Sequence, residues 1–183
     1  KDMDLVVSYG ERISSIIVAS VLNAKHWNSL ELIKTNKGLR KNILNSALTY
    51  SNLGNAYNGE ERIVMGGFIS SDVESGEITN LGRGGSDYTA AIVASALNAD
   101  ALEIWTDVDG FLTADPRLVR NAYTIEELSY IEAVELSNFG AKVIYPPTIY
   151  PDYEKNIPLY IRNSYNPEFK GTKISGQKSA EGK

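Results

Sequence analysis

The chain has 183 residues and a formal net charge of −5, which predicts one domain with a sizeable core and argues against nucleic acid or membrane as partners. The absence of cysteine excludes disulfides, thiolate metal sites and cysteine nucleophiles, and it fits a cytoplasmic protein. The single histidine, His26, argues against a histidine-based triad or a multi-histidine metal centre, and no apolar run is long enough for a membrane span.

Strand-like and helix-like segments alternate along the chain, which predicts an α/β layered fold with a mostly parallel sheet. Ser8 and Glu11 fit a capping box that would open the first helix. The elements predicted in the first half are a helix over 12–23, a strand over 29–33, a helix over 41–53, a buried strand over 62–70 and a hairpin through the turn 72–76 into 77–80.

The second half continues the alternation. Thr124 with Glu127, and Ser129 with Glu132, each match the capping pattern of a short helix. Two consecutive prolines at 146–147 favour the start of a further helix that reaches about residue 155. The other elements predicted here are a helix over 87–98, a strand over 101–106, an acidic turn over 107–110, a final strand over 158–163 and a linker or disordered tail over 176–183.

The stretch Leu81-Gly82-Arg83-Gly84-Gly85-Ser86-Asp87-Tyr88-Thr89-Ala90 carries most of the chemistry. Its glycines permit close backbone approach, and a helix N-terminus offers free N–H groups to an anion. Arg83 can bind a carboxylate or phosphate with two parallel hydrogen bonds. The loop lacks the ending of a P-loop and the third glycine of a dinucleotide fingerprint. A plain turn with Ser86 as helix N-cap remains the alternative.

This decapeptide closely resembles the substrate loop of aspartokinases, within the amino-acid kinase family. Further stretches agree with that family in the same order, and the resemblance runs from about residue 5 to residue 175. These stretches are Ser8-Tyr9-Gly10-Glu11, Gly67-Phe68-Ile69, Trp105-Thr106-Asp107-Val108-Asp109-Gly110, Asp115-Pro116-Arg117 and Phe139-Gly140-Ala141-Lys142-Val143. The resemblance implies a three-layer α/β sandwich with helices on both faces of a mostly parallel sheet.

The resemblance also implies an activity: transfer of the γ-phosphoryl group of ATP, with Mg²⁺, to the β-carboxylate of L-aspartate. The product, 4-phospho-L-aspartate, enters lysine, threonine and methionine synthesis. Two alternatives stay open. One is another amino-acid kinase, acting on acetylglutamate or glutamate, and the other is a non-catalytic module for nucleotide binding or assembly.

On the substrate side, the resemblance implies that Arg83 binds the α-carboxylate of aspartate and that Glu11 binds its α-ammonium group. A capping role is the rival interpretation for Glu11. Phe68 would line the aspartate pocket, although core packing explains it nearly as well. Ser86 would contact substrate at the helix entrance. The catalytic residue implied is Asp87. It would orient substrate and an essential lysine, or help to hold magnesium, rather than act as a general base.

On the nucleotide side, the resemblance implies four contacts: Thr106, Asp107, Arg117 and Lys142. Thr106 and Asp107 follow a strand, and open α/β sheets bind ligands at the carboxyl ends of their strands. Arg117 and Lys142 can neutralise phosphate charge. Each of these residues taken alone is more often a surface residue, and no metal ligand is assigned.

Residues 1–175 are expected to form a partial catalytic domain. Aspartokinases carry a Lys-Phe-Gly-Gly strand before this region and ACT domains after it, and neither is found in this sequence. The isolated chain is therefore expected to be inactive, and the full-length parent is expected to be a homo-oligomer. Two histidines of many relatives are replaced by Tyr9 and Tyr145, and Leu112 stands where some relatives place a tyrosine near the nucleotide.

Overall fold

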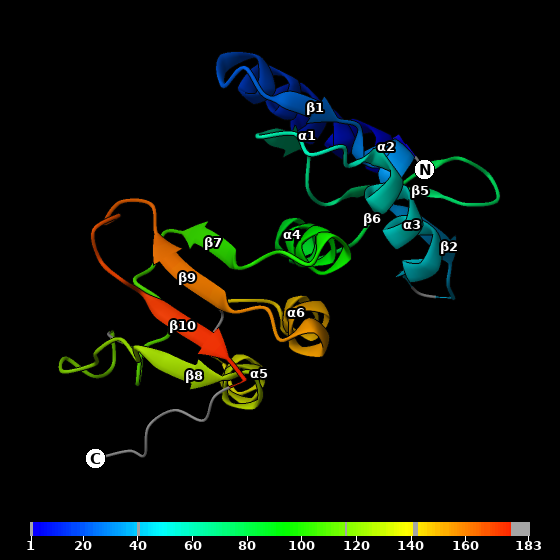
Figure 1. Cartoon of the computed structure of the whole chain (residues 1–183). Coiled ribbons are helices and arrows are strands. Elements are labelled where there is room, and N and C mark those ends of the chain that lie inside the picture. The colour runs from blue at the N-terminus through cyan, green and yellow to red at the C-terminus, as the bar shows by residue number, and fades with distance from the viewer. Residues whose placement is uncertain (1, 40, 116, 141–142, 177–183) are drawn as a thin grey trace. The chain divides into compact units, whose positions relative to one another are not determined.

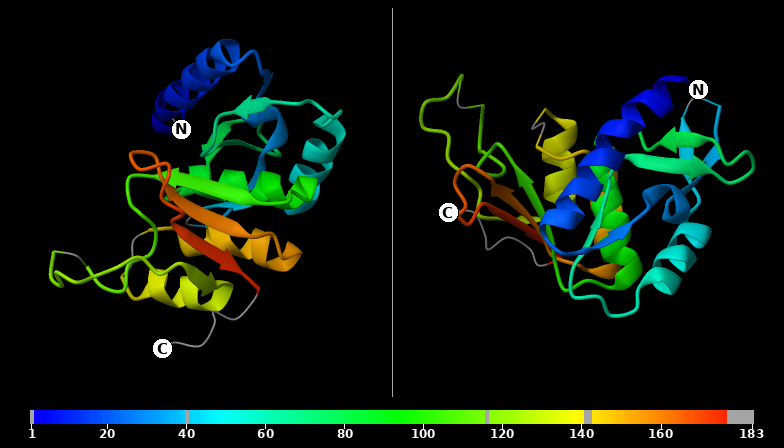
Figure 2. Two further views of the ribbon diagram at one scale, coloured as in Figure 1. Left: turned by 60° about the vertical axis from the view of Figure 1, so that its left-hand side comes forward. Right: turned by 90° about the horizontal axis from the view of Figure 1, so that it is seen from above.

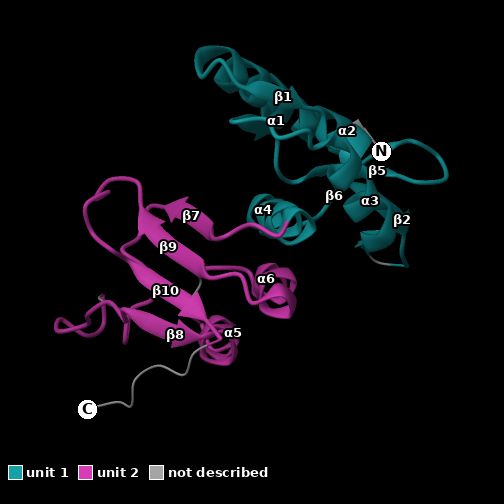
Figure 3. Cartoon of the chain, in the orientation of Figure 1, with its two compact units in different colours: residues 1–97 teal, residues 98–183 magenta. Residues whose placement is uncertain are grey.

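The computed structural model describes residues 2–39, 41–115, 117–140 and 143–176 (Figure 1). Most of the predicted tail, residues 177–183, lies outside them, as does Lys142. The chain divides into two compact units, Lys1–Leu97 and Asn98–Lys183 (Figure 3). No helix in the described ranges is both long and apolar enough to cross a membrane.

Unit 1 contains a four-stranded mixed sheet, a separate pair of parallel strands and three longer helices. The sheet has the order β3-β2-β5-β6, and β1 pairs with β4. The elements are α1 (Asp2–Val21), β1 (Lys25–Trp27), α2 (Ser29–Leu32), β2 (Lys34–Lys37), β3 (Asn42–Leu44), α3 (Ser46–Ala56), β4 (Ile63–Met65), β5 (Ile69–Asp72), β6 (Ile78–Asn80) and α4 (Gly85–Leu97).

The core of unit 1 forms where α3 and α4 pack together beside the strands. Its buried members are Trp27, Ile33, Leu53 and Ile92. On α4 the buried positions include the small residues Ala91 and Ala94, which let the helix approach its neighbours closely. The first turn of α4, which carries Ser86 and Asp87, is thereby fixed against this core.

Unit 2 contains a four-stranded sheet of order β7-β9-β10-β8, with helices α5 and α6 on one face (Figure 2). Apolar side chains such as Ile104, Leu159, Ile161 and Ile174 are buried at this sheet. The elements are β7 (Leu102–Thr106), β8 (Glu127–Ser129), α5 (Tyr130–Asn138), the short 3₁₀ helix η1 (Pro146–Thr148), α6 (Ile149–Lys155), β9 (Leu159–Asn163) and β10 (Thr172–Ser175).

The α/β class is confirmed, and four of the seven strand pairs within the described ranges are parallel.

The start of the first helix was predicted wrongly. It begins at Asp2, and Ser8 lies inside it, fully buried, with its hydroxyl donating to the carbonyl oxygen of Leu5 at 2.7 Å. Because Ser8 is not at the start of a helix, Glu11 does not act in a capping box.

Of the other elements predicted in unit 1, one is confirmed, and the others differ from the prediction in type or in boundaries. The predicted strand over 29–33 is the short helix α2, which Asn28 caps, and the predicted helix over 41–53 is a strand followed by α3. The apolar run over 62–70 is two strands, β4 and β5, separated by a turn at 66–68. The hairpin into 77–80 is confirmed.

In unit 2 the strand β7 and the helix after the two prolines are confirmed. Ser129 and Glu132 form the predicted capping box of α5, with the Glu132 side chain accepting from the Ser129 N–H at 2.7 Å. The matching pattern at Thr124 was wrong, since Glu127 starts strand β8. Strand β9 is followed by β10, so it is not the last strand.

Candidate active site

Two glycines in the turn between β4 and β5 bring predicted substrate residues together. A Cβ atom at Gly66 would lie 3.1 Å from the backbone oxygen of Glu11 on α1. A Cβ atom at Gly67 would lie 2.8 Å from Ser86 Cα and 3.2 Å from Ser86 Oγ. Because glycine has no Cβ, α1 and α4 can both approach this turn at backbone contact distance. The turn therefore lies between Glu11 and Ser86.

Phe68, the last residue of this turn, has a strained backbone. Its φ is +68°, and the Ile69 N–H donates to the Gly67 carbonyl oxygen at 2.7 Å, which is the pattern of the rare γ-turn. The Phe68 N–H donates to Thr89 Oγ1 at 3.0 Å, so α4 holds the turn in place. Strain maintained by surrounding contacts is concentrated at binding and active sites. This observation supports a site at the half-buried Phe68.

Arg83 lies in the turn before α4 and is exposed. The turn is stabilised locally, because Gly82 donates to Asn80 Oδ1 at 2.8 Å and accepts from the Gly85 N–H at 3.0 Å. Within the described ranges the Arg83 guanidinium has neither a hydrogen bond nor an ion pair. The group that would bind a substrate carboxylate is thus available to it.

Helix α4 begins at Gly85, so Ser86 lies inside its first turn and not at the N-cap position of the alternative interpretation. Ser86 is exposed, whereas Asp87 is half-buried. Burial raises the pKa of the Asp87 carboxyl above its ordinary value. A perturbed carboxyl at a helix N-terminus, beside a strained turn, is a typical feature of a functional site.

Replacing Gly67 by alanine tests the contact that joins the turn to α4. The new methyl group would meet Ser86 backbone at 2.8 Å, so we expect a loss of about 1–3 kcal/mol in the free energy of unfolding. The matched control is Gly54→Ala near the end of α3, where no atom lies within 4 Å. Urea unfolding should show that this control is neutral or up to about 1 kcal/mol more stable. Equal effects of the two substitutions would contradict the packing argument.

The nucleotide-side residues lie in unit 2. Thr106 ends β7, and its hydroxyl donates to the Asp107 carboxylate at 3.2 Å. The parallel neighbour β9 ends at Asn163, directly opposite Thr106. Asn163 Nδ2 donates to Asp109 Oδ1 at 2.8 Å. Polar groups therefore gather at the carboxyl ends of two parallel strands, where α/β sheets bind ligands.

Sequence reasoning missed Asn163 and treated Asp109 as ordinary turn chemistry. The only available signal was an asparagine at the end of the predicted strand over 158–163. Its partner Asp109 lies 54 positions earlier, so only the pairing of β7 with β9 brings them together.

Arg117 is exposed and occupied by a local partner. Its Nε and Nη2 atoms donate to Asp115 at 3.0 and 2.7 Å, which lowers the pKa of that carboxyl to about 2. Both side chains belong to one loop. Binding of a phosphate by Arg117 would require exchange of this carboxylate for the phosphate. Lys142 lies outside the described residues.

Among the described side chains, no group of three or more histidines, cysteines, aspartates or glutamates is arranged to hold a metal ion. Magnesium does not need such a group, because it keeps several waters and is commonly held by substrate phosphates with one or two carboxylates. Each unit carries a carboxylate of the kind that could serve as such a ligand, Asp87 in unit 1 and Asp107 in unit 2, each considered by itself.

Comparison with known proteins gives consistent matches. The bifunctional aspartokinase/homoserine dehydrogenase of Buchnera aphidicola is 41% identical over 97% of this chain and 22% of its own length. The lysine-sensitive aspartokinase 3 of Escherichia coli is 37% identical over 93% of this chain and 40% of its own. The chain thus spans less than half of either relative.

A solved structure agrees with these matches and confirms the predicted fold. The crystal structure of E. coli aspartokinase III in complex with aspartate and ADP superposes with a TM-score of 0.89 at 35% identity. That match covers 97% of this chain and 41% of the other. The sequence profile of the Amino acid kinase family matches residues 1–163. The chain therefore belongs to the amino acid kinase family.

Proposed function

We propose that this chain is part of an aspartate kinase, which transfers the γ-phosphoryl group of ATP to the β-carboxylate of L-aspartate. One observation carries the proposal. The strained turn at Phe68 lies against Glu11 on one side and Ser86 on the other, and Arg83, which has no partner among the described residues, precedes Ser86 by three positions. The segments on the two sides of this turn carry an anion, Glu11, and a cation, Arg83, and an α-amino acid has one charged group for each.

The substrate-side roles are those that the resemblance to aspartokinases implies, and this arrangement is compatible with them. Arg83 binds the α-carboxylate with its planar guanidinium, and Glu11 binds the α-ammonium group. Ser86 offers its hydroxyl and the N-terminal N–H groups of α4 to negative charge. Asp87 positions the reacting groups, because a β-carboxylate is already ionised at neutral pH and needs no general base.

The reaction itself requires alignment and charge stabilisation. An oxygen of the β-carboxylate attacks the γ-phosphorus, a new P–O bond forms, and the bond to the β-phosphate oxygen breaks to release ADP. Thr106 and Asp107 contact the nucleotide at the end of β7, and Arg117 and Lys142 neutralise its phosphates. Bound Mg²⁺ supplies further positive charge on the phosphates.

The proposal also covers the full-length parent protein. We propose that this parent is a cytoplasmic homo-oligomer that binds L-aspartate and MgATP and interacts with neither nucleic acid nor membrane. The net charge of −5 supports the last point, and the similarity to an aspartokinase solved with aspartate and ADP supports the two ligands.

Calorimetric titration of the 183-residue chain tests the assignment. We expect binding of MgADP and of L-aspartate, with affinity for aspartate about tenfold higher than for L-glutamate or N-acetyl-L-glutamate. ADP release in the presence of aspartate should stay near background for this isolated chain. A chain that binds neither ligand would instead be a scaffold, and preference for another acid would point to a different amino-acid kinase.

A further inference from the structure

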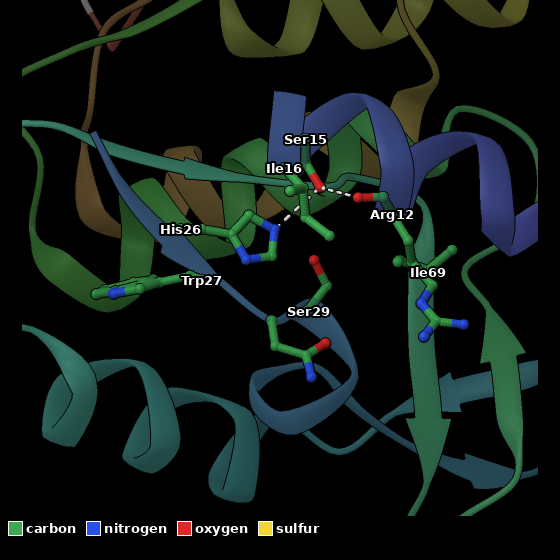
Figure 4. Close-up of a pocket in the computed structure, with 8 residues that line it drawn as sticks. Arg12, Ser15, Ile16, His26, Trp27, Ser29 and Ile69 are labelled. Atoms are coloured by element: carbon green, nitrogen blue, oxygen red, sulfur yellow. Dashed lines mark hydrogen bonds between the residues drawn. The ribbon is translucent and has the colours of Figure 1, made fainter. Parts of the chain in front are cut away.

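Unit 1 contains a hollow that borders the turn at 66–68 and is lined by Arg12 and His26. Its volume is about 160 Å³, and it lies among α1, β1, α2 and β5 (Figure 4). Most of its lining surface is apolar, but five of its eight lining residues have polar side chains, and none of these is a carboxylate. The lining comprises Arg12, Ser15, His26, Asn28 and Ser29, with apolar contributions from Ile16, Trp27 and Ile69.

Arg12 and Glu11 are neighbours in sequence but lie on different sides of α1. Successive residues on an α-helix are about 100° apart, so residues at i, i+3 and i+4 share one side. Arg12, Ser15 and Ile16 share the side of α1 that lines the hollow, whereas Glu11 lies against Gly66. The hollow and the proposed substrate site therefore use different side chains of α1, although both border the turn at 66–68.

The charge of Arg12 is uncompensated. No described carboxylate lies within ion-pair distance of its guanidinium, and its five N–H donors have no acceptor in the described ranges. The guanidinium lies over the ring of Tyr9, with Cζ 5.3 Å from the ring centroid. This contact fixes one face of the group and leaves its N–H edge free.

The opposite wall of the hollow is preorganised. The Ser15 hydroxyl donates to the Arg12 carbonyl oxygen at 3.0 Å, so its oxygen accepts from His26 Nε2 at 3.1 Å. Ser29 is 2% exposed and donates to the Gly66 carbonyl oxygen. Figure 4 shows Arg12 and His26 at two sides of the hollow, with Ser29 between them. Their positions are set before any ligand arrives.

We propose that this hollow binds a small oxyanion, a phosphate or a short carboxylate, held by the guanidinium of Arg12. The planar fork of arginine matches two oxygens of either anion. The volume equals that of roughly five water molecules, which excludes a nucleotide but admits a group of four or five heavy atoms.

Isothermal titration of the chain with sodium phosphate, and separately with sodium acetate, tests the site at constant ionic strength set with sodium chloride. We expect one anion per chain with a Kd on the order of 1 mM. Arg12→Gln should weaken binding about tenfold or more. The control Arg62→Gln should leave it unchanged, because that exposed guanidinium already pairs with Glu61 at 3.2 Å. The two titrants decide which oxyanion is preferred.

A third variant separates this site from the glycine loop. If Arg83→Gln removes the binding and Arg12→Gln does not, the anion binds at α4 and the proposal is overturned. Absence of binding to the wild-type chain overturns it as well. Should Arg12→Gln fail to fold by circular dichroism, Arg12→Lys keeps the charge without the fork. We then expect binding weakened about threefold or more, and undiminished binding by a folded Arg12→Lys variant would refute the assignment.

Discussion

An Arg83→Gln variant of the full-length protein is expected to lose roughly 100-fold or more in kcat/KM for L-aspartate, chiefly through a higher KM. In the proposed complex Arg83 pairs with the α-carboxylate, which does not react. Its loss therefore weakens binding of substrate and transition state alike. Coupled ADP-release kinetics over a range of aspartate concentrations measure both constants.

The fold should tolerate this change. Arg83 is exposed and has no partner in the described ranges, so its removal leaves no buried group unpaired. We expect the melting temperature of Arg83→Gln to match that of the control Arg62→Gln, whose kinetics should be normal. Unaltered aspartate kinetics in Arg83→Gln would refute the proposed contact, and a marked drop in stability would show a structural role instead.

Local sequence chemistry predicted some elements and misled on others. The pair Ser129 and Glu132 forms a capping box, as predicted, whereas the same spacing at Ser8 and Glu11 lies inside a longer helix. Both patterns satisfy the local rule. The difference is that a helical segment precedes Ser8, so its hydroxyl donates to a carbonyl of the preceding turn.

Strand boundaries depend on contacts that the sequence does not show. The apolar run over 62–70 reads as one strand, yet it is interrupted where Gly67 meets Ser86 and Phe68 bonds to Thr89. The short strands β1 and β10 pair with partners far along the chain, and three or four residues give too weak an alternation to be recognised.

The candidate site was predictable in part, through ordered motifs rather than through composition. Contacts through Gly66, Gly67 and Gly85 join Glu11, Phe68 and the start of α4, and the substrate assignment of these residues remains a prediction. The sequence did not predict the ion pair between Arg117 and Asp115, and it did not predict the hollow beside His26. Each depends on side-chain geometry within a loop or between elements.

A buried acid in unit 2 makes stability depend on pH. Asp152 on α6 is 0% exposed, and neither of its carboxylate oxygens has a hydrogen-bond partner within the described ranges. The Thr148 hydroxyl, one turn earlier, is equally buried and unpartnered. Burial raises the pKa of Asp152 to about 7, and burial together with the Asp152 charge raises the pKa of Tyr130 to about 12.

Whether stability rises or falls with pH depends on which state of the chain, folded or unfolded, binds the proton of Asp152 more tightly. A carboxyl whose pKa is about 7 in the fold and 3.8 in the unfolded chain is preferentially protonated in the fold. Its contribution to the free energy of unfolding is therefore fully present below pH 3.8 and is lost as the pH rises to about 7. The loss amounts to about 4 kcal/mol, on the order of 1.4 kcal/mol for each pH unit.

Replacing Asp152 by asparagine removes the ionisation while keeping the shape of the side chain. We expect Asp152→Asn to be about 3 kcal/mol more stable than the wild-type chain at pH 8, and within about 1 kcal/mol of it at pH 4. Urea unfolding at pH 4, 6 and 8 measures this difference. The control Asp100→Asn, at an exposed position of unit 2, should follow the wild-type pH dependence. A constant difference between Asp152→Asn and wild type across these pH values would show that the fold does not raise the pKa of the Asp152 carboxyl.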